Sequence, residues 1–220
     1  DEDLSLVAGE TQYIHTDTKN LARSLARGHL RCVEVCSEVE PGESLGGITV
    51  AVQGCGDIGR EVINTLREQG AMVIAADLEK EKMDEVARST GALLGDPNTI
   101  LEQAVDVLAP CAIGGVLTPQ GVTRFEAKAL CGAANNILSE PSVGAQLARL
   151  GIVVVPDMIA SAGAVIDGIG ETVMGLSERR PLIDELAMTS RAVVEKARAQ
   201  KIDAQVIAER LAWKRIAEGR

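Results

Sequence analysis

Short apolar runs alternate with longer amphipathic segments through the middle of the chain. The apolar runs are typical of buried β-strands, and they occupy residues 48–53, 72–76, 92–94, 105–109, 129–132 and 152–155. Residues 57–69 and 79–89 carry apolar positions at helical spacing between the first three runs. Such alternation predicts an α/β fold, a doubly wound parallel sheet with helices on both faces.

The two ends of the chain differ from the middle. Residues 1–19 are polar with few apolar positions and predict an irregular lead-in, followed by a helix over residues 20–35 that ends before Pro41-Gly42. Residues 182–200 and 203–218 predict two charged amphipathic helices that pack on the domain or against a partner. We therefore divide the chain into a lead-in segment with its helix (1–40), an α/β domain (41–180) and C-terminal helices (181–220).

A glycine-rich turn lies between the first predicted strand and the helix that follows it. It reads Gly54-Cys55-Gly56-Asp57-Ile58-Gly59. The first glycine permits a tight turn, the second lets the backbone approach a pyrophosphate, and the third lets helix and strand pack closely. Free N–H groups at the start of the helix attract phosphate. This spacing predicts a dinucleotide site on a Rossmann-type domain.

An acidic residue ends the second predicted strand. Asp77, followed by Leu78, lies 18 residues after Gly59 (77 − 59). At about this spacing in dinucleotide sites, a carboxylate accepts hydrogen bonds from the hydroxyls of the adenosine ribose. The same carboxylate repels a 2′-phosphate, so we predict NAD rather than NADP as the cofactor.

Composition excludes several classes of protein. The net charge of −10 and the pI near 4.8 argue against nucleic acid as a partner, and only three aromatic residues are available for stacking on bases. The apolar runs are far shorter than the ~20 residues of a membrane span, and no signal-like segment opens the chain. We expect a cytoplasmic protein without membrane contact.

The five cysteines and two histidines suggest no metal site. The cysteine number is odd and no C-x-x-C pair occurs, which is typical of reduced, intracellular cysteines. Cys32 and Cys36 share one helix face, but no second pair with zinc spacing follows. Both histidines, His15 and His29, are expected to be exposed.

Segments after the later strands carry a family resemblance. Residues 110–115 (PCAIGG) follow the fourth predicted strand, residues 132–136 (GAANN) the fifth, and residues 156–166 (PDMIASAGAVI) the sixth. Together with the first strand and its glycine turn, they resemble the cofactor domain of the glutamate/leucine/phenylalanine/valine dehydrogenase family, especially its leucine and phenylalanine branch. The resemblance extends from the first residues to the C-terminal helices.

The resemblance implies an NAD-dependent, reversible oxidative deamination of an L-amino acid to a 2-oxo acid, in a homo-oligomer or with a partner subunit. It implies that Ala112 and Ile113 line the cofactor channel through their backbone and that Asn135, next to Ala134, lies near the nicotinamide and the substrate amine. The predicted cofactor-binding residues are therefore Gly54, Cys55, Gly56, Asp57, Ile58, Gly59, Asp77, Leu78, Ala112, Ile113, Ala134 and Asn135.

The chain also departs from the family pattern. In the family, the catalytic lysines and aspartate belong to a separate N-terminal domain, and residues 1–16 resemble the segment just after that aspartate, so we expect no catalytic residue in this chain. Leu21 replaces a threonine that faces the nicotinamide amide, while Ser161 and Ala164 stand where the family usually has asparagine and glycine.

Two functions follow from these departures. The chain is either the NAD-binding domain of a dehydrogenase whose catalytic domain is supplied elsewhere, or an NAD(H)-binding module or assembly subunit without catalysis. A third alternative is a vestigial, empty site.

Several individual residues keep a simpler interpretation. Asn135 and Asn136 can be an ordinary turn pair after a strand, and Asp157 can merely cap the next helix. Cys55 and Cys111 are expected to fill space near the cofactor rather than act as nucleophiles.

Overall fold

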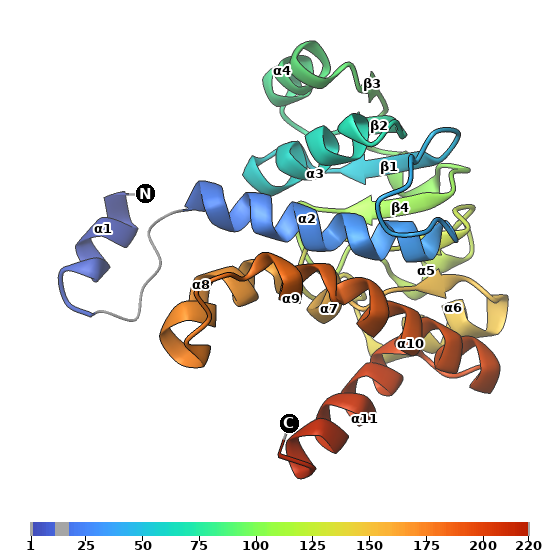
Figure 1. Cartoon of the computed structure of the whole chain (residues 1–220). Coiled ribbons are helices and arrows are strands. Elements are labelled where there is room, and N and C mark those ends of the chain that lie inside the picture. The colour runs from blue at the N-terminus through green and yellow to red at the C-terminus, as the bar shows by residue number, and fades with distance from the viewer. Residues whose placement is uncertain (1, 12–17, 220) are drawn as a thin grey trace.

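Six parallel strands form one sheet in residues 2–11 and 18–219, which the computed structural model describes (Figure 1). Their order across the sheet is β3-β2-β1-β4-β5-β6. The strands are β1 (Thr49–Gln53), β2 (Met72–Ala76), β3 (Leu93–Leu94), β4 (Val107–Pro110), β5 (Ala129–Leu130) and β6 (Val153–Val154). All six lie within the predicted apolar runs or differ from them by one residue, so the predicted Rossmann-type sheet is confirmed.

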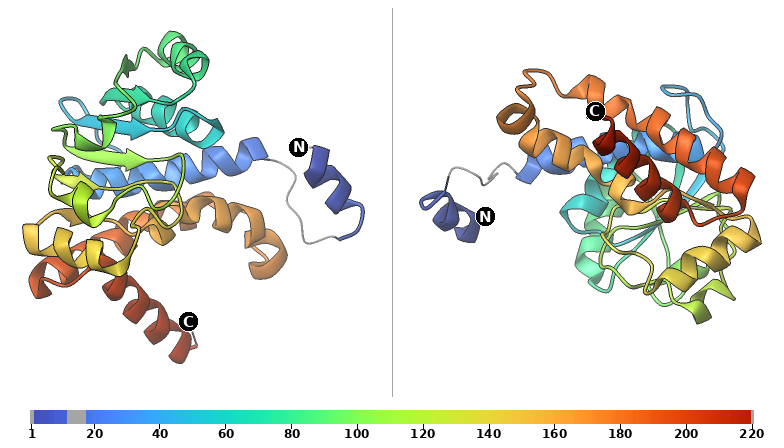
Figure 2. Two further views of the ribbon diagram at one scale, coloured as in Figure 1. Left: turned by 180° about the vertical axis from the view of Figure 1, so that it is seen from behind. Right: turned by 90° about the horizontal axis from the view of Figure 1, so that it is seen from below.

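Helices cover both faces of the sheet. They are α1 (Glu2–Ala8), α2 (Thr18–Cys36), α3 (Asp57–Glu68), α4 (Lys80–Thr90), the 3-10 helix η1 (Ile100–Glu102), α5 (Pro119–Val122), α6 (Pro141–Leu150), α7 (Asp157–Ala160), α8 (Ala162–Met174), α9 (Arg180–Asp184), α10 (Leu186–Gln200) and α11 (Ala204–Ala217). Seen from opposite sides in Figures 1 and 2, α2, α3 and α10 lie over one face, whereas α5 and α6 lie over the other.

Alternating side chains of β1 separate the two cores. Val50 and Val52 belong to the core formed with α2, α3 and α10, and Ala51 faces the second core formed with α5 and α6. Both valines and the alanine are fully buried, because a parallel strand with helices on both sides has no solvent face.

The strand order creates a switch point beside β1. Gln53 at the end of β1 pairs with Ala76 of β2 on one side and with Pro110 of β4 on the other. The chain leaves β1 toward β2 and β3, then crosses back to begin the other half of the sheet at β4. The loops after β1, β2 and β4 therefore meet at one edge, where open α/β sheets bind ligands.

Two expectations about the ends of the chain are wrong. Residues 1–19 are not irregular throughout, because α1 occupies Glu2–Ala8 and α2 begins at Thr18. The low apolar content of residues 1–19 left no helical spacing from which α1 could be predicted. The single helix expected over residues 182–200 is interrupted at Glu185, whose ψ of −11° separates α9 from α10.

Packing at the C-terminus follows the sequence pattern in part. Asp203 caps α11 by accepting a hydrogen bond from the Gln205 N–H at 3.0 Å. The start of α11 is buried, whereas Trp213 and Ile216 nearer its end are 70% and 64% exposed. Residues of α2, the sheet, α10 and α11 contribute to one core. The division of the chain into segments at residues 41 and 181 stays a prediction.

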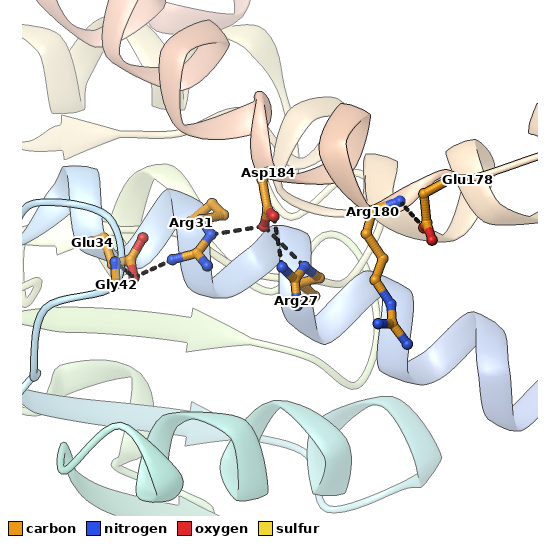
Figure 3. A network of polar contacts seen from close by, with 7 residues as sticks. All are labelled: Arg27, Arg31, Glu34, Gly42, Glu178, Arg180 and Asp184. Atoms are coloured by element: carbon orange, nitrogen blue, oxygen red, sulfur yellow. Dashed lines mark hydrogen bonds and ion pairs between the residues drawn. The ribbon is translucent and has the colours of Figure 1, made fainter. Parts of the chain in front are cut away.

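A polar network that the sequence did not predict holds α9 against α2 (Figure 3). Arg27 donates two hydrogen bonds to Asp184, at 2.9 and 2.6 Å, and Arg31 donates a third at 3.0 Å. Arg31 also donates to Glu34 at 2.6 Å, and this fully buried carboxylate accepts the Gly42 N–H at 3.0 Å. Charge-assisted bonds of this kind are stronger than neutral ones. Through them α2 holds both α9, at Asp184, and the turn that follows α2, at Gly42.

Replacement of Asp184 tests this network. Asp184→Asn removes the negative charge shared by Arg27 and Arg31, and we expect a loss of about 1–2 kcal/mol in the free energy of unfolding, discounted for the partial exposure of the pair. The measurement is urea denaturation followed by circular dichroism. Glu185→Gln is the matched control, because Glu185 is exposed and forms no ion pair within the described part of the chain. Equal midpoints for the two variants would contradict the role assigned to Asp184.

Candidate dinucleotide site

The three glycines after β1 differ in their surroundings. Gly54 has a φ of 107°, and a Cβ there would lie 2.8 Å from the Cβ of Ala112. A Cβ on Gly59 would lie 2.0 Å from the Gly54 carbonyl oxygen, so α3 can approach the turn only because this position has no side chain. A Cβ on Gly56 would meet nothing within 4 Å. Tight turn, close packing and open space thus fall at the three positions where a dinucleotide site needs them.

Helix α3 presents its N-terminus at this turn. Gly56 is the N-cap residue and no side chain caps the helix. Asp57 and Ile58 begin the helix, and their backbone N–H groups belong to the first turn, which has no partner within the helix itself. The positive end of the helix dipole adds to these donors, so the turn is suited to bind an anion.

Asp77 connects the ends of β1 and β2. Its Oδ2 accepts the Cys55 N–H at 2.7 Å, and its Oδ1 accepts the Glu79 N–H at 2.9 Å. Partial burial opposes ionisation, but these backbone donors and the Lys82 charge outweigh it and hold the pKa of Asp77 below its ordinary value. Each carboxylate oxygen has a second lone pair for another donor, so Asp77 can bind a diol while it holds the turn.

Two large apolar side chains are exposed beside these polar groups. Leu78, directly after Asp77, is 89% exposed, and Ile113, on the loop after β4, is 67% exposed. Large apolar residues that are exposed singly are common in folded proteins, so these two gain meaning only from their position beside the turn. Ala112 on the same loop reaches the Gly54 turn, so the loops after β1 and β4 are in direct contact.

The loops after β4, β5 and β6 are joined by backbone contacts. The Gly115 N–H donates to the Asn136 carbonyl at 2.7 Å, and a Cβ on Gly114 would lie 2.4 Å from the Asn135 carbonyl oxygen. The Asn136 N–H donates to Asp157 Oδ2 at 2.5 Å. These three loops therefore form a continuous rim that begins at the Gly54 turn.

All of the predicted site residues lie on loops or helix starts at the carboxyl edge of the sheet. Asn135 is exposed there, Ala134 beneath it is buried, and Asn136 has a left-handed φ of 54°, so the pair does form a turn. Asp157 does not cap α7 with its side chain but fixes the Asn136 backbone. Sequence reasoning missed this contact and the Gly114 approach, since neither has a signature at short range in the chain.

The cysteines near the site are not activated thiols. Burial, followed by the nearby Asp77 charge, raises the pKa of Cys55 to about 11. Burial raises the pKa of Cys111 to about 12. Both thiols stay protonated at neutral pH, and the expectation that they fill space is supported. Within the described residues, no group of three His, Cys, Asp or Glu side chains could hold a metal ion.

His29 is not exposed as expected but fully buried, because the inner face of α2 packs on the sheet. Its Nε2 donates to the Cys131 carbonyl at 2.8 Å and anchors the start of the loop that carries Asn135. Burial lowers the pKa of His29 to about 4, although the bond to Cys131 acts in the opposite direction. His15 lies outside the described residues.

Comparison with known proteins identifies the origin of this site. The family model of glutamate/leucine/phenylalanine/valine dehydrogenase matches residues 76–219. The chain belongs to this dehydrogenase family. The resemblance found in the loop motifs is thereby confirmed. The chain corresponds to the nucleotide-binding domain in this family of NAD-dependent amino-acid dehydrogenases.

Individual relatives match nearly the whole of this chain, but the chain corresponds to only part of each relative. Leucine dehydrogenase of Bacillus subtilis (strain 168) is 32% identical over 224 residues, which cover 98% of this chain and 61% of the relative. The crystal structure of L-tryptophan dehydrogenase from Nostoc punctiforme has a TM-score of 0.80 at 30% identity, covering 90% of this chain and 61% of that one. The chain thus spans about three fifths of the length of these relatives. None of the helices in its described part has the length and apolar character to cross a bilayer.

The buried histidine makes stability depend on pH. The unfolded chain binds a proton at His29 below about pH 6.5, whereas the folded chain binds it only near pH 4. The contribution of His29 to the free energy of unfolding is therefore fully present above pH 6.5. It falls as the pH drops through this window, by about 2 kcal/mol between pH 7.5 and pH 5. His29→Gln keeps a donor for the Cys131 carbonyl but does not titrate. We therefore expect the loss of unfolding free energy between these two pH values to be smaller in this variant by about the same amount. Urea denaturation of both proteins at the two pH values measures it, and equal losses would exclude the assignment.

Proposed function

We propose that this chain supplies the NAD-binding domain of an amino-acid dehydrogenase that catalyses reversible oxidative deamination of an L-amino acid to a 2-oxo acid. The observation that carries the proposal is the Gly54–Gly59 turn at the start of α3, open at Gly56 and tied to the ionised Asp77. The similarity to leucine dehydrogenase and L-tryptophan dehydrogenase supports an apolar amino acid as the substrate class.

The residues at the carboxyl edge of β1, β2 and β4 fit the successive parts of a dinucleotide. The backbone N–H groups of Gly56, Asp57 and Ile58 bind the pyrophosphate, which the open space beside Gly56 admits. Asp77 accepts the ribose hydroxyls and disfavours a 2′-phosphate, so NAD is preferred over NADP. Leu78 and Ile113 provide apolar surface for the adenine. NAD, when bound, supplies the hydride acceptor.

The opposite half of the rim positions the reacting end. Asn135 is exposed on the loop that Asp157 and His29 hold from two sides. Its amide can both donate and accept, which suits a position between the nicotinamide and the substrate amine. The proton-transfer residues are supplied by another domain or polypeptide, because none of the seven lysines lies on the loops after β1, β4 or β5.

One observation favours a second candidate, an NAD(H)-binding module without catalysis. Leu21 of α2 packs against α8, where a Cβ on Gly168 would lie 3.3 Å from the Leu21 Cδ2. Leu21 replaces the family threonine that faces the nicotinamide amide, and an apolar side chain at this position cannot hydrogen-bond the carboxamide. An assay of NAD reduction over a panel of L-amino acids separates the candidates: turnover supports the dehydrogenase, and NAD binding without turnover supports the module.

Replacement of Asp77 tests the cofactor assignment. We expect Asp77→Ala to weaken NAD binding about 10- to 100-fold, because it removes charge-assisted bonds to the ribose. NADP binding changes much less, since the repulsion of the 2′-phosphate is removed at the same time. Isothermal titration with both nucleotides measures the difference. Glu81→Ala, an exposed acid on α4, is the control, and equal losses of NAD and NADP would refute the role of Asp77.

The second and third glycines of the turn separate binding from folding. Gly56→Ala places a methyl group in open space, so we expect an unchanged melting temperature but at least about tenfold weaker NAD binding, because the methyl occupies the pyrophosphate position. Gly59→Ala forces α3 away from the Gly54 carbonyl and lowers the melting temperature itself. Differential scanning calorimetry and titration of both variants show this contrast. Full NAD affinity in Gly56→Ala would place the pyrophosphate elsewhere.

A further inference from the structure

The last turns of α11 expose two large apolar side chains. Trp213 is 70% exposed and Ile216 is 64% exposed, and every position from 212 to 219 is exposed. Figures 1 and 2 show that this end of α11 points away from the sheet and from α10. The beginning of the same helix is buried, so α11 packs on the domain through its first turns, and the described part of the chain leaves the rest uncovered.

The exposed side chains belong to one face of the helix. At about 100° per residue, Val206, Trp213 and Ile216 fall within about 80° of one another, and Glu209 lies between them. We call these four residues the outer stripe of α11. The residues that α11 buries lie on the opposite face. The outer stripe is therefore a second surface of α11, separate from the one that packs on the domain.

The outer stripe begins at a cavity of about 540 Å³. This cavity lies between the start of α11, the start of α6 and the loops that follow β5 and β6. Val206 and Glu209 line it from α11. Leu138, Pro141 and Pro156 supply part of its apolar wall. One face of α11 thus joins an apolar cavity near its start to exposed apolar side chains near its end.

Every charged side chain that lines the cavity is acidic. These residues are Glu140, Asp157, Asp203 and Glu209. None of them forms an ion pair within the described residues. The starts of α6, α7 and α11 each add about +0.5 of an elementary charge, so between two and three negative charges remain without compensation. Without Asp203, whose carboxylate also contacts Gly144 of α6, the excess is still more than one charge.

The pKa of Asp203 reflects this surplus. Burial and the nearby Glu209 charge raise the pKa of Asp203, although the hydrogen bond from the Gln205 N–H acts in the opposite direction. No cation contributes to the shift. The cavity is therefore suited to a partner that is apolar and carries positive charge.

The exposed end of α11 has the opposite charge. Residues 210–217 contain Arg210, Lys214 and Arg215 but no acidic residue. Arg210 and Arg215 form no ion pair within the described ranges, and Lys214 lies 3.8 Å from Glu218. Acids at the start of a helix and bases at its end suit the dipole of α11 itself. The dipole does not account for the exposed apolar residues, nor for the acids that α6 and α7 bring to the cavity.

We propose that the outer stripe pairs with the outer stripe of a second copy of this chain, with the two α11 helices antiparallel. This arrangement places the basic, apolar end of each helix over the acidic cavity of the other copy. Trp213 of each copy enters the other cavity beside Val206, where its indole N–H meets carboxylate acceptors. Near the two-fold axis, Glu209 lies opposite Arg210 of the second copy.

The composition of the surface favours a second copy as the partner. In a two-fold symmetric pair the same patch serves both copies, so each contact forms twice. The outer stripe carries both halves that such a pair needs, because the acidic cavity and the basic apolar end lie on one helix. The contact is small, since α11 has 14 residues and a length of about 21 Å. We therefore expect a weak, reversible dimer with a Kd of about 10–100 μM.

Trp213 is the only tryptophan of the chain and therefore reports its own burial. The test follows the whole chain without nucleotide from about 1 to about 500 μM, by sedimentation equilibrium and tryptophan fluorescence. We expect the emission to move to shorter wavelength over the concentration range in which the dimer forms. Trp213→Ala raises the Kd at least about tenfold without a change in melting temperature, because the side chain is exposed in the single copy. Met188→Ala, which removes an apolar side chain of α10 that is 66% exposed, leaves the Kd unchanged.

Charge variants test the antiparallel register. Glu209→Lys and Arg210→Glu each place like charges opposite one another at both symmetry-related contacts, and we expect each to raise the Kd at least about tenfold. The double variant restores opposite charges and returns the Kd to within about threefold of the original. Adjacent residues of a helix do not face each other, so this rescue cannot arise within one copy. Glu81→Lys, at an exposed position of α4, is the control for a change of net charge.

Three results would overturn the proposal. The first is a chain that stays monomeric up to about 500 μM, which would leave the outer stripe to a different polypeptide such as a catalytic domain. The second is a dimer that Trp213→Ala does not weaken, which would place the interface elsewhere. The third is a double charge variant that associates no better than the single variants.

Discussion

The close contact between α3 and the turn after β1 is the constraint on which the site depends. Gly59 lies so near the Gly54 carbonyl that no side chain fits between them. This approach directs the first turn of α3 toward the carboxyl edge of the sheet, where its N–H groups converge. The position of Asp77 follows from it, because the Cys55 N–H that the carboxylate accepts belongs to the same turn. One missing Cβ thus sets the geometry of helix, turn and acid together.

Long-range order is assembled around α2 rather than around the sheet alone. This helix buries His29 and Glu34, and its arginines hold α9 through Asp184. The bond from His29 to Cys131 extends its influence to the rim that carries Asn135. Polar residues buried in this way are costly unless they are paired. Glu34 has its partners nearby, whereas His29 bonds Cys131 and Arg31 bonds Asp184, each more than a hundred residues away.

The sequence predicted the features that repeat or are local. The six strands follow from apolar runs, and the site residues at the turn follow from the spacing of Gly54, Gly56 and Gly59 to Asp77. Features set by distant packing were not predictable in this way. The burial of His29 depends on the face of α2 that meets the sheet, and the interruption at Glu185 accompanies the contact of Asp184 with Arg27. The contact of Asp157 with the Asn136 N–H could not be predicted, because it depends on the position of a loop 21 residues away in the chain.

The two hydrogen bonds that Asp77 accepts from its own chain have a further consequence. The carboxylate is oriented before any ligand arrives, because the Cys55 and Glu79 amides fix both of its oxygens. A nucleotide therefore meets an acceptor whose rotamer is already selected, and association costs little side-chain entropy at this point. The part of the site proposed for the adenosine is in this sense a rigid template, and the ordering cost of binding falls on the ligand more than on the protein.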